Sequence, residues 1–195
     1  MGQPELQLSD EEIGFYRDTF LFAQEASKTS FEQFLRSEYD VQVQEIPDGD
    51  RVNFDHWLCS MAVDLGWSNI GLKLHYQSKF ARKIGVQRLG MPSKLIPEKL
   101  LRDLIQEYLN LCMGKIKSRF GSDSMMVSLP ISQPTGDQQD PRQDVIDRNS
   151  DSWKVVWPEG HFYLSCQIHL VTTIENAQKI QKDVEINLDS MEMFT

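Results

Sequence analysis

The alternation of apolar and polar residues predicts two long helices and several short strands. Residues 96–120 read IPEKLLRDLIQEYLNLCMGKIKSRF, and no proline follows Pro97 within this stretch. Its apolar residues recur at intervals of three and four, the period of a helix with one buried face. They are Leu101, Leu104, Ile105, Tyr108, Cys112 and Ile116. Pro97 and Glu98 suit a helix start and Gly121 suits a helix end, so we predict one helix of about six turns.

A second helical pattern occupies residues 11–37. Its apolar positions are Ile13, Phe20, Ala23, Ala26, Phe31, Phe34 and Leu35. Ser9 and Glu12 have the spacing of a capping box at the start of this segment. The pattern fits either one long helix or a helix with a break near Thr29.

The remaining apolar segments are short. We predict strands over 41–46, 52–65, 70–75, 153–157 and 161–171, a strand over 125–132 that is broken by Pro130, and a further helix over 78–89. The strands alternate, and each long helix has a single apolar stripe. We therefore expect an α+β fold in which the two long helices, 11–37 and 96–120, lie on one face of a mostly antiparallel sheet.

A chain of 195 residues suits one domain, here 1–195. We expect three appendages on this domain. Residues 1–10 are polar and predicted to be loose. Residues 133–152 have low hydrophobicity and are interpreted as an exposed loop. Residues 173–195 form a C-terminal extension, interpreted as a short helix followed by a strand or tail.

The charge of the chain limits its partners. A net charge of -9 argues against nonspecific binding to nucleic acid or to an anionic membrane. No apolar stretch reaches the length of a membrane span, and the first residues lack the basic and apolar regions of a signal peptide. We expect a cytoplasmic protein whose partners are proteins or small molecules.

The cysteines and histidines are too scattered to form an obvious metal site or disulfide framework. Cys59, Cys112 and Cys166 lie far apart and in apolar surroundings, so we expect reduced, buried thiols. The four histidines have no ligand spacing with a cysteine or carboxylate. We therefore expect no metal bound by this chain.

The polar side of the 96–120 helix contains a candidate site. Glu107, Asn110 and Gly114 lie opposite the apolar stripe and within about 60° of one another on the helix surface. The residues alone leave two interpretations: an ordinary solvated face, or a binding or catalytic site. A glycine inside a helix costs about 1 kcal/mol relative to alanine. Either a neighbouring helix packs at Gly114 or the backbone of a partner approaches there.

Several segments, taken in order, resemble a known family. They are GLKLHY at 71–76, FARKIGVQRLG at 80–90, the E-x-x-N-x-x-x-G motif of Glu107, Asn110 and Gly114, and MMVSLPISQPTGD at 125–137. Over residues 18–171 the chain is similar to the CheC/CheX/FliY family of chemotaxis phosphatases. The chain has one E-x-x-N motif rather than two, which makes it most similar to the CheX members of this family. Tyr108, Cys112 and Met113 are bulkier than the residues usual in the family, but they leave both reactive side chains in place.

The resemblance implies a function. Such a protein hydrolyses the aspartyl phosphate of a CheY-type response regulator, with Asn110 positioning a water, Glu107 contacting the regulator's active-site lysine and Gly114 allowing close approach. It binds no cofactor itself, since Mg²⁺ is held by the regulator, and it forms a homodimer through sheet edges. Two alternatives stay open: a non-catalytic module that binds a response regulator, and a purely structural role for the motif.

Overall fold

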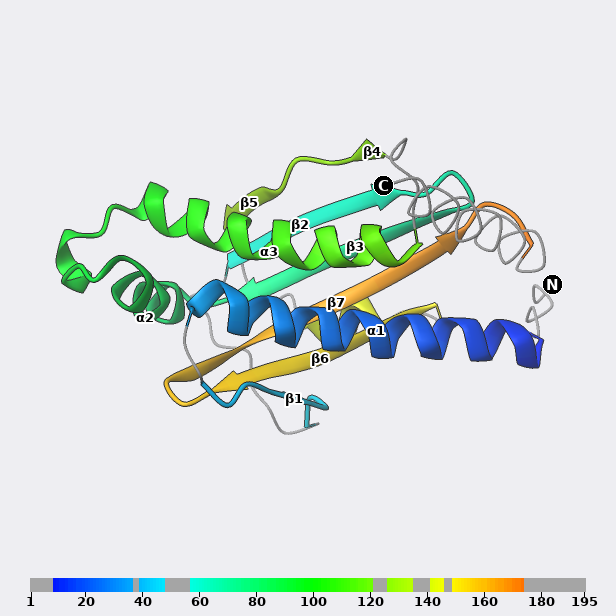
Figure 1. Cartoon of the computed structure of the whole chain (residues 1–195), viewed down its shortest axis with the longest axis horizontal. Coiled ribbons are helices and arrows are strands. Elements are labelled where there is room, and N and C mark those ends of the chain that lie inside the picture. The colour runs from blue at the N-terminus through cyan, green and yellow to red at the C-terminus, as the bar shows by residue number, and fades with distance from the viewer. Residues whose placement is uncertain are drawn as a thin grey trace, which may run out of the picture.

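The computed structural model describes residues 9–36, 39–47, 57–120, 126–134, 141–145 and 149–173. Its three α-helices lie together on one face of a twisted sheet (Figure 1). The α-helices are α1 (Asp10–Leu35), α2 (Ser78–Leu89) and α3 (Glu98–Phe120), and two short 3₁₀ helices are η1 (Ser93–Leu95) and η2 (Pro141–Asp144).

The sheet is antiparallel in every pairing among the described strands. The strands are β1 (Gln42–Gln44), β2 (Trp57–Asp64), β3 (Ser68–Tyr76), β4 (Met126–Val127), β5 (Ile131–Pro134), β6 (Ser150–Trp157) and β7 (Gly160–Leu170). Their order is β1-β6-β7-β3-β2, and both β4 and β5 pair with the outer edge of β2. The expected α+β fold class, with two long helices on one face of an antiparallel sheet, is confirmed.

The two long helices run side by side across the sheet (Figure 1). At the start of α1, the Ser9 backbone N–H donates to Glu12 Oε2 at 2.7 Å, and the Glu12 N–H donates to Ser9 Oγ at 3.2 Å. This is the predicted capping box. The helix continues without a break at Thr29 and ends at Arg36, whose φ is 53°. The pattern over 11–37 therefore corresponds to one helix.

An aromatic cluster fills the space between the helices and the sheet. Phe31 of α1 lies at its centre, with its ring centroid 4.9 Å from that of Phe162 and 5.3 Å from that of Tyr108. The Tyr108 hydroxyl donates to the Ser27 carbonyl at 3.0 Å, and Trp153 Nε1 donates to Ser27 Oγ at 3.0 Å. Tyr108 thus joins α3 to α1 inside the core. Its bulk is accommodated there, on the side of α3 away from the candidate site.

All three cysteines are free and buried, as expected. Burial raises the pKa of the Cys112 thiol to about 12. Burial raises the pKa of Cys59 and of Cys166 as well. These thiols are therefore protonated at neutral pH.

The predicted exposed loop over 133–152 differs from the structure. Residues 133–134 belong to β5, 141–144 form η2, and 150–152 open β6. Pro141 and Ser150 are buried, and η2 lies against β6 and β7. The prediction depended on low hydrophobicity, but Ser152 and Lys154 alternate along β6 with Trp153 and Val155, which face the core. Strand residues that face away from the core are often polar, so composition alone does not distinguish such a strand from a loop.

Other boundaries also shift. Residues 1–8 and 174–195 lie outside the described residues, and with them most of the predicted loose N-terminus and of the predicted C-terminal helix and tail. Asp10, at the end of the segment predicted to be loose, already belongs to α1. The described part of the 52–65 segment begins at Trp57. The segment 125–132 divides at Pro130 into β4 and β5, and Ser128 Oγ between them accepts a hydrogen bond from the Ala62 N–H at 2.8 Å.

Candidate functional site

The three candidate residues lie on the exposed face of α3. Glu107, Asn110 and Gly114 are all exposed, whereas Tyr108 and Cys112, in the same turns, are buried. The helix packs on the sheet and on α1, so the 3- and 4-residue spacing leaves these three on a single solvent-facing line. The predicted exposure of the Glu107 and Asn110 side chains is confirmed.

Glu107 has a partner within the chain. Its Oε1 accepts from Arg88 Nη2 at 3.1 Å, and 49% of the Glu107 side chain is exposed against 14% for Arg88. Arg88 lies in the last turn of α2, and its guanidinium carbon sits 5.2 Å from the centroid of the Phe34 ring. Sequence reasoning missed Arg88, because the pair joins two helices and no local spacing indicates it.

Asn110 has no hydrogen-bond partner among the residues that the structure describes. It borders an open depression between α1 and α3. The other residues lining this depression are Phe22, Gln33, Leu111, Gly114, Lys115, Ser118 and Arg119. An exposed carboxamide at the edge of an open depression is accessible to another macromolecule.

The structure bears on one of the two explanations offered for Gly114, the packing of a neighbouring helix. A Cβ placed on this glycine would meet no described atom within 4 Å, apart from its own helix backbone and chain neighbours. No neighbouring helix within the described chain therefore requires glycine here. The other explanation, approach by the backbone of a partner, stays a prediction.

Two cations line the depression beside Asn110. Lys115 Nζ donates to Thr29 Oγ1 of α1 at 2.7 Å, and the Arg119 guanidinium carbon lies 5.7 Å from the centroid of the Phe22 ring. Lys115 and Arg119 are residues of α3, and both side chains contact α1. The depression has positive walls, although the chain carries a net charge of -9. Such a surface attracts an anionic group.

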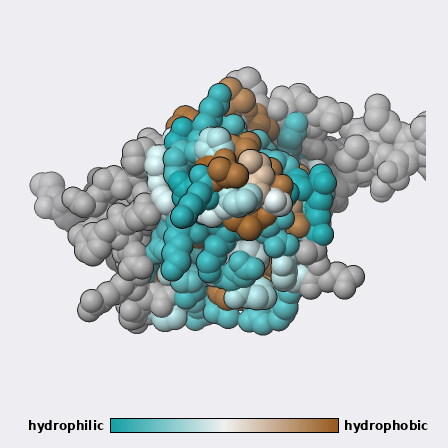
Figure 2. All heavy atoms as spheres, turned by 90° about the vertical axis from the view of Figure 1, so that its left-hand side faces the viewer, coloured by the Kyte–Doolittle hydropathy of each residue, from teal (hydrophilic) through white to brown (hydrophobic). Residues whose placement is uncertain are grey.

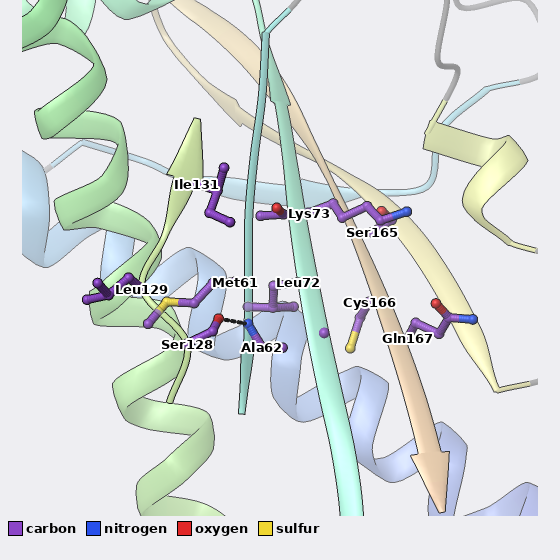
Figure 3. A pocket seen from close by; sticks show the side chains of 12 residues that line it. Met61, Ala62, Leu72, Lys73, Ser128, Leu129, Ile131, Ser165, Cys166 and Gln167 are labelled. Carbon is purple, nitrogen blue, oxygen red and sulfur yellow. Dashed lines mark hydrogen bonds between the residues drawn. The ribbon is translucent and has the colours of Figure 1, made fainter. Parts of the chain in front are cut away.

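A separate cavity of about 220 Å³ opens on the other face of the sheet. It lies over β2, β3 and β7 and beside the linker between β4 and β5 (Figure 3). Leu129 and Ile131, with 84% and 60% exposure, form its apolar side. None of the three candidate residues lines it.

The described part of the chain offers no cluster of three or more His, Cys, Asp or Glu side chains suited to a metal ion. No helix among the described residues has both the length and the apolar character needed to cross a membrane. Figure 2 views the end of the molecule formed by α2 and η1, where a small apolar patch lies among hydrophilic atoms. Val86 and Leu95 are exposed apolar residues of these two elements.

Comparison with solved structures identifies the fold. The chain superimposes on the chemotaxis protein CheX from Vibrio vulnificus with a TM-score of 0.57 and 11% identity, over 78% of this chain and 99% of that one. It matches the CheX-CheY-BeF3-Mg²⁺ complex from Borrelia burgdorferi with a TM-score of 0.53 and 10% identity, over 79% and 97%. FliY from Thermotoga maritima matches with a TM-score of 0.51 and 12% identity, over 91% and 99%.

A scan against protein-family models and a search of curated proteins find no match. The structural similarities nevertheless extend over nearly the whole length of each solved chain. The chain therefore has the CheC/CheX/FliY type of fold, in agreement with the resemblance seen in its sequence.

Proposed function

We propose that this chain is a phosphatase that hydrolyses the aspartyl phosphate of a CheY-type response regulator by positioning a water molecule. One observation carries the proposal. Asn110 is exposed and without a described partner, one helical turn from Glu107 and beside a glycine with open space above it. The CheX-like fold and the solved complex of such a fold with CheY support the class of partner.

The chemistry requires little of this chain. An acyl phosphate is already labile, and the regulator supplies its own Mg²⁺. A carboxamide can hold a water in line with the P–O bond by hydrogen bonding, as the water-orienting glutamine of GTPases does. A hundredfold acceleration corresponds to about 2.7 kcal/mol, which positioning alone can supply. Asn110 takes this role in our proposal.

Glu107 binds the lysine of the regulator's active site in this scheme. Arg88 occupies Oε1 of its carboxylate. No described group hydrogen-bonds the other oxygen, and nearly half of the side chain is exposed. A carboxylate can accept from two cations at once. Glu107 can therefore anchor an ammonium group while it stays paired with Arg88.

The positive depression supports an anionic partner. Lys115 and Arg119 line it together with Asn110. A phosphorylated regulator presents its negative charge at the group to be hydrolysed, and complementary charge speeds encounter and fixes orientation. Because these cations would favour docking whether or not hydrolysis follows, they also support the alternative, a non-catalytic module that binds a response regulator.

Phosphate release from an acetyl-phosphate-charged CheY-type regulator tests the proposal. We expect the wild-type chain to accelerate release, and Glu107→Ala to raise KM more than it lowers kcat, because the lysine contact serves binding. A titration that shows binding without accelerated release would establish the alternative. If no CheY-type regulator of the source organism is bound or dephosphorylated by the chain, both proposed functions are wrong.

We also propose that the chain forms a homodimer through a sheet edge, as the sequence resemblance implies. The β4–β5 edge exposes Val127, Leu129 and Ile131. This edge pairs with no further strand among the described ones, and such an edge with exposed apolar side chains favours association. Light scattering after gel filtration should give a dimer mass for the wild type and a monomer mass for Leu129→Asp. A monomeric wild type would contradict this part of the proposal.

A further inference from the structure

We propose that Arg88 is a positioning residue: it holds the Glu107 carboxylate in the orientation that accepts the partner's cation. The inference rests on the proposed function and extends it to a residue of another helix. It concerns the binding step, because Arg88 contacts Glu107 rather than the reacting atoms.

Arg88 is fixed from several sides. Only 14% of its side chain is exposed, and its guanidinium lies over the ring of Phe34, a core residue. It lies in the last turn of α2, where the helix dipole favours a cation. Gly90, with a φ of 63°, ends the helix directly after this turn. The guanidinium therefore presents a rigid donor to Glu107.

The ion pair between Arg88 and Glu107 is hard to explain by stability alone. An ion pair with a half-exposed carboxylate contributes little to folding. Arg88 Nε is buried and has no hydrogen-bond partner among the described residues, which is unfavourable. Arg88 is thus held in a costly position where it can contact the exposed Glu107 carboxylate. This cost is explained if the orientation of the Glu107 carboxylate matters for binding a partner.

A second pair between the same helices provides the matched comparison. Arg82 of α2 forms an ion pair with Glu98 of α3. Arg82 Nη1 also donates to the Ser93 carbonyl at 3.1 Å, so this pair supports the turn between the helices. Arg82 and Arg88 thus make the same type of link between α2 and α3, but only Arg88 reaches the candidate site.

Holding a glutamate in one orientation before binding removes the entropic cost of ordering it during binding. Loss of Arg88 should therefore weaken the encounter and leave the chemical step unchanged. From the usual cost of immobilising one such side chain, we expect KM to rise roughly three- to tenfold with kcat unaltered.

The experiment is a double-mutant cycle on phosphate release and on regulator binding. It compares the wild type, Arg88→Met, Glu107→Gln and the double variant, with Arg82→Met as the control and Arg88→Lys as the conservative variant. We expect Arg88→Met to raise KM and Kd, Arg88→Lys to retain part of the wild-type affinity, and Arg82→Met to change neither. The double variant should bind no more weakly than Glu107→Gln alone, because Arg88 acts through Glu107.

Each of these outcomes would overturn the inference: additive effects in the double variant, an equal loss in Arg82→Met, or a lower KM in Arg88→Met. The last would show that Arg88 competes with the partner's cation. Circular dichroism and urea unfolding of each variant separate misfolding from weakened binding. If the wild type binds no regulator, the proposed function fails together with the inference. If the wild type binds and Glu107→Gln weakens binding while Arg88→Met does not, only the inference fails.

Discussion

The helices α1 and α3 cover the same face of the sheet, yet their exposed sides differ. Both carry a glutamate followed three residues later by a polar residue: Glu25 and Lys28 on α1, Glu107 and Asn110 on α3. Seven residues after the glutamate, α1 has Glu32 where α3 has a glycine. On α1, Lys28 Nζ lies 4.0 Å from Glu32 Oε1 of the same helix.

The difference separates an ordinary solvated face from a candidate site. On α1, Lys28 and Glu32 pair along their own helix, which is a usual arrangement on an exposed face. On α3, Glu107 pairs with another element and Asn110 has no described partner. The α3 face thus presents hydrogen-bonding groups that its own helix does not use. Spacing alone therefore does not identify a site; the contact with Arg88 and the open space above Gly114 make the α3 face the candidate.

The largest effect that distinguishes the two faces should come from Asn110→Ala. We expect phosphate release from the charged regulator to fall about a hundredfold or more, because the water loses its orienting group. Folding should be intact, since alanine is the better helix former at an exposed position. The measurements are kcat for phosphate release, the Kd for the regulator and the urea midpoint. Wild-type release by Asn110→Ala would remove the catalytic role from α3.

Substitutions of Gly114 should separate stability from function. Gly114→Ala should raise the free energy of unfolding by about 0.5–1 kcal/mol, because a Cβ meets nothing there and glycine is unfavourable inside a helix. Gly114→Leu should raise KM about tenfold, equivalent to about 1.4 kcal/mol, by blocking the approach of the partner.

Urea unfolding and KM should be measured on both Gly114 variants. If Gly114→Leu binds the regulator as tightly as the wild type, the open space above the glycine has no role in docking.

The sequence predicts the fold well and the site in part, for different physical reasons. Helical periodicity is a local property, so α2 was found at its observed bounds and α1 and α3 within two residues at each end. The exposure of Glu107 and Asn110 follows from the same periodicity. Arg88 could not be found in this way, because its position depends on how α2 packs against α3. The positive depression likewise depends on the packing of α1 against α3.

The buried sides of the two helices also differ, and pH should reveal it. The buried side of α3 carries the Cys112 thiol, whereas that of α1 carries the hydroxyls of Ser27 and Ser30. Burial raises the pKa of Cys112 from 9.0 to about 12. Below pH 9 the thiol is protonated in both states and has no effect. Between pH 9 and 12 the unfolded chain ionises and the folded chain does not, so stability falls as pH rises.

One such thiol should remove up to about 1.4 kcal/mol from the free energy of unfolding per pH unit. Urea unfolding at pH 8 and pH 10 should show a steeper loss for the wild type than for Cys112→Ala. Cys59 and Cys166, whose pKa values burial also raises, contribute in the same direction to both proteins. Equal losses in the two proteins would show that the Cys112 thiol ionises in the folded state.

The smallest expected effect comes from giving α1 the spacing of α3. Lys28→Asn produces Glu-x-x-Asn on α1, and it is best examined in the Asn110→Ala background, where any phosphate release must come from the new asparagine. We expect release to stay at the background rate, because Glu32 occupies the place that glycine has on α3 and would hinder a partner's approach. Losing the Lys28–Glu32 pair should change the free energy of unfolding by no more than about 0.5 kcal/mol. Restored release would mean that an exposed Glu-x-x-Asn pair suffices, and that neither the glycine nor the contact with Arg88 distinguishes α3 from α1.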